Sequence, residues 1–118
     1  MAVTNNVLLT GVALLTDTSA TSTAVVAKAS SAVLYELELD NTANAAASYF
    51  KIYNHGSPTV GTTVPDWVIM VPASTSRSLV IPGGLTFGTA MSYAATTAGG
   101  TSGSTSPTSA FDVKLVYV

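Results

Sequence analysis

Apolar and polar residues alternate along several short stretches of this 118-residue chain. Side chains alternate across a β-strand, so such stretches predict strands with one buried face. The run VLYELELDN (33–41) divides into two faces, one with Val33, Tyr35, Leu37 and Leu39 and the other with Leu34, Glu36, Glu38 and Asp40. In FDVKLVYV (111–118) an apolar set likewise opposes Asp112 and Lys114. We therefore expect the Leu and Tyr side chains of the first run to point into a core.

No stretch sustains a helical period, and Ser, Thr, Gly and Pro separate the apolar runs. The pattern predicts eight strands, at residues 7–15, 24–29, 33–41, 48–54, 67–71, 78–81, 91–96 and 111–118. Pro72 and Pro82 are expected to end two of these strands, because proline cannot donate to a ladder. The fold class is therefore all-β. The whole chain, residues 1–118, is expected to form a single β-sandwich domain, of the eight-stranded jelly-roll type.

Charge is scarce in this chain. Only 8% of the residues are charged, against about 25% in an average soluble domain. Such a surface protects a free monomer weakly against aggregation, which suggests that other subunits cover part of it. With four cations and a net charge of −2, the chain is not expected to bind nucleic acid. It has no cysteine, which excludes disulfides and thiolate zinc sites.

The run VLLTGVALL (7–15) is apolar but far too short to span a bilayer. No Lys or Arg precedes it, so we do not expect it to direct secretion. We expect no membrane partner and a protein made and used without export.

Glu36, Glu38 and Asp40 are half of the six acids in the chain. On one strand face they would stand roughly 6.6 Å apart, a spacing that overlaps the separation of a glycosidase acid pair. Catalysis would require environments that push two pKa values apart, and a metal site would require converging oxygens; a flat row supplies neither. We interpret the acids as a solvated strand face, or as a surface that meets a cationic strand or a basic partner.

For the remaining candidate residues we also favour roles other than catalysis or metal binding. His55, the only histidine, lies in the turn sequence NHGSP without a nucleophile motif, so neither a triad nor a zinc site is expected. Arg77 lies in a polar turn and is a candidate contact with a neighbouring subunit. GGLTFG (83–88) lacks the Lys of a phosphate loop and is interpreted as a turn after Pro82. Trp67 is expected to anchor the core, with a sugar-stacking platform as the alternative.

The sequence predicts no catalytic residue, no cofactor and no metal ligand, and the protein is not expected to be an enzyme. The low-complexity stretch AGGTSGSTSPT (98–108) is predicted to be a surface loop that is mobile when nothing contacts it. Five residues remain as interface candidates: Glu36, Glu38, Asp40, His55 and Arg77.

From residue 41 to 97 the order of motifs is distinctive: NTANAAASYFKIYN, then SPTVGTTVP, then WVIMVPASTSRSLVIPGGLTFGTAMSYAATT. This order resembles a group of small virion proteins of tailed phages and prophages. Their pattern has an Asn-Thr and small residues before an aromatic-Lys-aliphatic-Tyr strand. A Pro-Thr-x-Gly-Thr loop, an apolar strand ending in Val-Pro-Ala and a Gly-aliphatic-x-Phe segment follow. The resemblance covers about half of the chain.

The resemblance implies a β-sandwich without enzymatic activity, located on the capsid as a cement (decoration) protein or in a tail or fibre. Cement proteins of this kind sit as trimers on the outer capsid surface. We therefore expect a homotrimer on the virion, assembled in the host cytoplasm, whose partner is the major capsid protein. The alternative is a tail or fibre module that recognises a host glycan through Trp67, Tyr53 or Tyr93.

Overall fold

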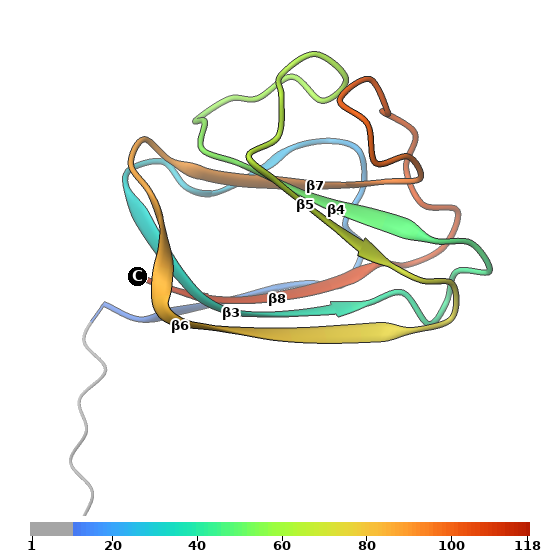
Figure 1. Ribbon diagram of the computed structural model, residues 1–118, viewed down its shortest axis with the longest axis horizontal. Coiled ribbons are helices and arrows are strands. Elements are labelled where there is room, and N and C mark those ends of the chain that lie inside the picture. The colour runs from blue at the N-terminus through green and yellow to red at the C-terminus, as the bar shows by residue number, and fades with distance from the viewer. Residues whose placement is uncertain (1–10) are drawn as a thin grey trace, which may run out of the picture.

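The computed structural model describes residues 11–118, which form two four-stranded antiparallel sheets packed face to face (Figure 1). Sheet A has the strand order β1-β8-β3-β6 and sheet B the order β2-β7-β4-β5. The strands are β1 (Ala13–Asp17), β2 (Val25–Lys28), β3 (Ala32–Asp40), β4 (Ser48–Tyr53), β5 (Trp67–Val71), β6 (Ser76–Phe87), β7 (Met91–Thr96) and β8 (Asp112–Tyr117). The predicted all-β class and eight-stranded sandwich are confirmed.

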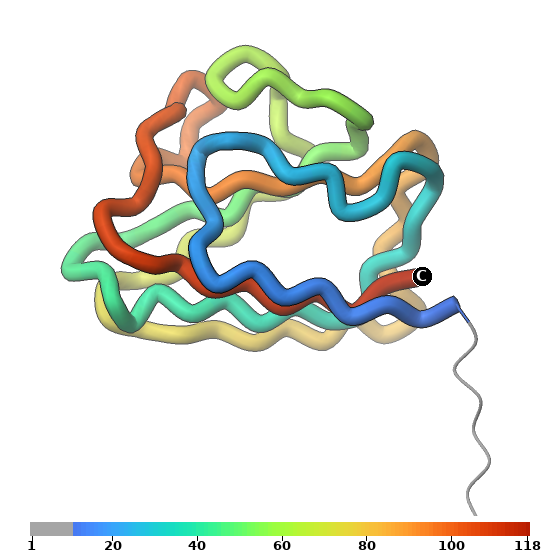
Figure 2. The backbone as a smooth tube through the Cα atoms, turned by 180° about the vertical axis from the view of Figure 1, so that it is seen from behind, coloured from blue at the N-terminus to red at the C-terminus, as the bar shows by residue number. Residues whose placement is uncertain are grey.

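The strand pairing follows one rule: β1 pairs with β8, β2 with β7, β3 with β6 and β4 with β5. The chain is thus one long antiparallel ribbon, rolled so that successive pairs enter opposite sheets. This is the predicted jelly-roll arrangement. Figure 2 shows its outermost pair, β1 and β8, running side by side along one layer.

Most predicted strand boundaries lie within one residue of the observed ones, and the exceptions are β1 and β6. Residues 7–10 of the first predicted strand lie outside the described residues. The prediction that Pro82 ends its strand is wrong, since β6 continues to Phe87. Gly83 and Gly84 have φ values of 79° and 80°, a left-handed conformation that glycine adopts without strain, and they let the strand bulge and resume. GGLTFG is therefore part of β6 rather than a turn between strands.

The same irregularity overturns the predicted orientation of Tyr35. The register of β3 against both neighbours shifts between Leu34 and Glu36. Tyr35 is an extra residue relative to β8, whereas residues 81–84 of β6 bulge out opposite it. Leu34 and Leu37 both face the core, although three positions apart, and Tyr35 is exposed. A bulge adds one residue to the alternation and reverses its phase, which simple period-2 counting does not detect.

The core lies between the sheets and is centred on Phe50 of β4. Its ring centroid lies 5.4 Å from that of Tyr93 on β7 and 6.3 Å from that of Phe111, just before β8. The predicted inward face of the last strand is confirmed, because Phe111, Val113 and Leu115 are buried. Apolar residues of both sheets therefore form one continuous core.

A buried asparagine joins the two sheets at one end of the sandwich. Asn41 follows β3, and its Nδ2 lies 3.0–3.1 Å from the carbonyl oxygens of Ala46, Val71 and Pro72. Its Oδ1 accepts a 2.8 Å hydrogen bond from the Ser48 hydroxyl at the start of β4. Asn41 thus connects the end of a sheet A strand to the ends of two sheet B strands, and its buried polar atoms are satisfied.

Candidate interaction surface

The three acids of β3 lie on the outer face of sheet A, each between two cross-strand neighbours. Glu38 lies between Lys114 of β8 and Ser78 of β6. Glu36 lies between Val116 and Val80. The predicted cationic neighbour strand is therefore β8 with Lys114. Lys51, the other cation considered, belongs to sheet B.

Asp40 faces an acid across the strands, because its register partner on β8 is Asp112. Its Oδ1 accepts hydrogen bonds from both the backbone N–H and the hydroxyl of Thr42, which lower the pKa of Asp40 below its usual value. Asp40 is thus held in its charged form. Like charges directly opposite each other on neighbouring strands are unfavourable.

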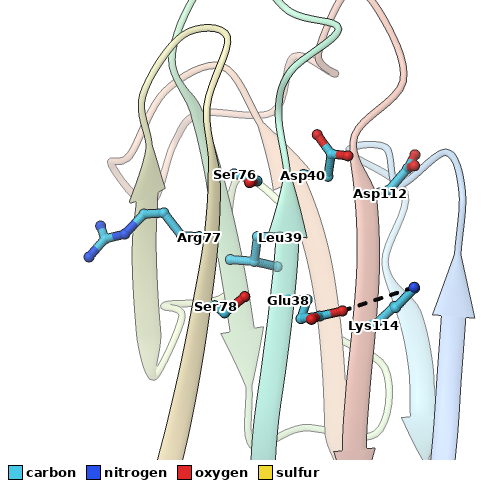
Figure 3. A pocket seen from close by; sticks show the side chains of 8 residues that line it. All are labelled: Glu38, Leu39, Asp40, Ser76, Arg77, Ser78, Asp112 and Lys114. Carbon is cyan, nitrogen blue, oxygen red and sulfur yellow. Dashed lines mark ion pairs between the residues drawn. The ribbon is translucent and has the colours of Figure 1, made fainter.

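Glu38, Asp40 and Asp112 help to line a shallow depression of about 240 Å³ (Figure 3). The lining comprises Glu38, Leu39, Asp40, Ser76, Arg77, Ser78, Asp112 and Lys114. Lys114 Nζ lies 4.0 Å from Glu38 Oε2, and both side chains are about half exposed. A pair this open to water contributes at most about 1 kcal/mol to folding. The depression is consequently a hydrated surface with an excess of carboxylates.

Arg77 does not neutralise these acids. Figure 3 shows its side chain extending away from Glu38 and Asp40, toward the neighbouring edge strand β5. There Nη1 donates a 2.8 Å hydrogen bond to the carbonyl oxygen of Met70. Arg77 therefore bridges the edges of the two sheets, and the structure brings it next to Glu38 and Asp40 only through its backbone.

The other end of the same face is apolar. Val12, Tyr35, Val116 and Val118 line a hollow of about 370 Å³. Beside it, Leu14 of β1 is 67% exposed and Val80 of β6 is 66% exposed. The outer face of sheet A thus has an acidic half and an apolar half.

The β3–β6 bulge shapes this apolar half. A Cβ on Gly84 would lie 2.3 Å from Val33 Cγ1 and 3.0 Å from Tyr35 Cε1. Only glycine leaves room for Tyr35 to lie over β6 in this way, so Gly84 and the exposed Tyr35 belong to one local feature. One feature of the sequence could have indicated this apolar surface, namely the run LVI (79–81). Consecutive apolar residues in a strand make both of its faces apolar.

Sheet B has a different outer face, because loops of the chain cover its two central strands and leave exposed residues on the edge strands β2 and β5. In Figure 1 the loops 54–66 and 98–108 lie above β4 and β7. Lys51 is fully buried there, and its Nζ donates to the carbonyl oxygens of Gly100 at 2.7 Å and Gly103 at 2.9 Å. Burial lowers the pKa of Lys51. The loop predicted to be mobile when uncontacted is in fact held by this lysine.

The remaining candidates lie in sheet B and its loops. His55 is exposed in the turn after β4, and its Nδ1 accepts a 2.9 Å hydrogen bond from the N–H of Ser57. It belongs to the opposite sheet from the acids of β3.

No group of three or more His, Asp or Glu residues within 11–118 is placed to hold a metal ion. Nor do these residues include a helix that is long and apolar enough to cross a membrane.

The aromatic candidates divide clearly by exposure. Tyr53 and Tyr93 are buried, so neither can stack on a sugar. Tyr93 donates a 2.7 Å hydrogen bond to Asp17 Oδ2, and burial together with this bond raises its pKa. Trp67 was expected in the core, but it begins the edge strand β5 and is 36% exposed. An edge strand leaves one side of a large side chain uncovered, which sequence periodicity does not reveal.

Comparisons with known proteins give no further guide to this surface: the chain matches no protein-family model, no curated protein and no solved structure.

Proposed function

We propose that this protein is a structural component of a tailed-phage virion, a capsid cement protein that binds the outer capsid surface as a homotrimer and stabilises the shell. The observation that carries the proposal is the contrast between the two sheet faces. The central strands of sheet B are covered by loops that Lys51 holds, whereas sheet A presents an uncovered face with an apolar and an acidic half. A rigid body with one face left open suits a clamp between larger subunits.

The resemblance over residues 41–97 supports the same function. Several residues of its motifs have structural roles: Asn41 connects the sheets, Lys51 holds a loop and Gly84 forms the bulge. The motif order is thus tied to how this sandwich is held together. The major capsid protein is the proposed partner.

Clamping requires area and multivalency rather than chemistry. Each subunit of a trimer makes a modest contact, and the second and third contacts then form at high effective concentration. Weak patches therefore add up to stable attachment. This account requires no catalytic activity, and replacing His55 with Ala should leave attachment unchanged.

The test is the copy number in purified particles of a phage that carries this gene. A count in the hundreds, equal to the number of capsid subunits or a simple fraction of it, is expected. Particles made without the protein should assemble but lose their genome at a lower temperature. Equal heat resistance with and without the protein would contradict the clamping role.

The exposed Trp67 favours a second candidate, a tail or fibre module that binds a glycan. A handful of copies per particle would favour it. Trp67 is the one aromatic of the three proposed that is open to stacking. Its fluorescence should then shift on addition of host glycans, and the shift should disappear in Trp67→Ala.

A further inference from the structure

The outer face of sheet A is left uncovered by every segment of residues 11–118 (Figure 1). In an antiparallel sheet with one solvated face, the outward residues are normally polar. Here the row across β1, β8, β3 and β6 runs from Leu14 through Val116 and Glu36 to Val80. Three of these four outward positions are aliphatic. An exposed aliphatic surface of this kind marks a contact with another molecule.

The acidic half of the face gives the sign of the partner's charge. The whole face carries four carboxylates, three of them in the acidic half, and Lys114 is the only cation among the outward residues described. Asp40 and Asp112 are register partners on neighbouring strands, which concentrates negative charge at this end of the face. Cations from a partner would be attracted to this end of the face.

A second copy of this chain offers few free cations to such a surface. Lys51 is buried under a loop, Arg77 is bound to the Met70 carbonyl, and Lys114 already belongs to the face. Lys28 alone remains, on β2 at the far edge of sheet B. If two copies packed these faces together, each would bring four carboxylates and a single lysine to the interface. Charge complementarity therefore favours a partner that brings its own cations over a second copy of this chain.

The size of the face suits a protein partner. Four strands about 4.8 Å apart, with β3 rising about 3.3 Å for each residue, give a surface on the order of 20 by 30 Å. Relief from side chains increases its accessible area. One partner contributes about 800 Å² to a standard protein interface, so this face is comparable to one whole interface.

We propose that the outer face of sheet A docks onto a different protein, whose surface carries Lys or Arg side chains beside exposed aliphatic ones. The apolar half of the face receives the aliphatic side chains, and the depression around Asp40 and Asp112 receives the cations. The inference rests on the proposed function, in which this partner is the major capsid protein. It adds which face docks and what chemistry the partner must have.

The test is photo-cross-linking from defined positions of the full chain, made in its native host. Benzoyl-phenylalanine replaces Leu14 or Val80, both highly exposed on sheet A. The control position is Val68, exposed on β5 of sheet B. Cross-linked peptides are identified by mass spectrometry. We expect cross-links from 14 and 80, and not from 68, to a peptide of another protein that contains Lys or Arg next to aliphatic residues.

The outcomes separate the docking face from the proposed function. If the cross-linked protein is the major capsid subunit, both hold; if it is a different basic-aliphatic protein, the docking face holds and the cement function fails. Cross-links from 14 and 80 to a second copy overturn the docking proposal without affecting the cement function. Cross-links only from 68, or none from any position, also overturn it.

Charge and apolar variants supply a second measurement on the cross-linked protein. Asp112→Lys and Leu14→Ser should each weaken binding about tenfold or more, and the loss from Asp112→Lys should shrink at high salt. Val68→Ser is the matched apolar control and should bind like the original chain. Equal affinities for Leu14→Ser and Val68→Ser would overturn the proposal. Unchanged circular dichroism spectra establish that the variants remain folded.

Discussion

The two outer faces of this sandwich differ in what covers them. On sheet B every residue of β7 is buried, and Lys51 is held under a loop by two carbonyl oxygens. On sheet A, Leu14 and Val80 stand about two-thirds exposed beside a group of carboxylates. Polar residues are therefore used in opposite ways: a cation stabilises the protein from within on sheet B, and charges remain available to a partner on sheet A.

The largest effect should come from filling the bulge that shapes the apolar half of sheet A. Gly84→Ala forces a positive φ on alanine and places its Cβ against Val33, so we expect a loss of about 3 kcal/mol in the free energy of unfolding. Gly83→Ala is the control, because it has the same φ but no atom within 4 Å of the added Cβ. It should cost only about 1 kcal/mol. Equal losses in urea denaturation would show that the close approach at Gly84 is unimportant.

The same substitution on each face tests the comparison directly. Lys51→Met removes two charge-assisted hydrogen bonds to the loop 98–108, and we expect it to cost about 2 kcal/mol. Hydrogen exchange in that loop should become faster. Lys114→Met, on the open face, should change stability by less than about 0.5 kcal/mol. If the two variants were equally stable, the covered face would not depend on its lysine.

Alkaline pH should act on the core between the two sheets, where Tyr93 reaches across to Asp17 of β1. Burial and the bond to Asp17 raise the pKa of Tyr93 above its ordinary value of 10.0, so the folded protein keeps a proton that the unfolded chain releases. Stability is therefore fully present below pH 10 and falls above it, by about 1.4 kcal/mol per pH unit for one such tyrosine. Tyr93→Phe should make the decline shallower. An unchanged slope in thermal melts between pH 10 and 11 would contradict this assignment.

The smallest effect on folding is expected on the open face. Leu14→Ser and Val80→Ser remove side chains that are already mostly in water, so each should alter stability by less than about 0.5 kcal/mol. Both should raise solubility, because they reduce an exposed apolar surface. A loss above about 1 kcal/mol in either variant would mean that the residue is packed rather than open.

Much of the fold could be predicted from the sequence, because alternation alone defines a strand with one buried face. The run around Phe111 and Val113 shows this, since its buried set is the predicted one. Tyr35 was predicted wrongly, because a bulge depends on the opposite strand and its two glycines. The prediction that Pro82 ends its strand was wrong for the same reason, because the bulge at Gly83 and Gly84 lets β6 continue.

The candidate surface was only half predictable. The acids of β3 stand out in a chain with six acids, but the aliphatic half depends on which strands become neighbours. Leu14 and Val80 lie far apart in the sequence. They belong to one row of cross-strand neighbours only because β8 and β3 lie between their strands in sheet A. Lys51 could not be distinguished from a surface lysine, because a loop nearly fifty residues later buries it.

The nested strand pairing also constrains how the chain folds. Ala13 pairs with Tyr117, so sheet A cannot be completed until synthesis has passed residue 117. The innermost hairpin, β4 with β5, closes the shortest loop, and each outer pair must close a longer one at a greater entropic cost. Such a high contact order predicts folding in milliseconds to seconds, with β1 and β8 joining last. Until then the apolar strands of sheet A stay exposed, and newly made chains are most vulnerable to aggregation during that interval.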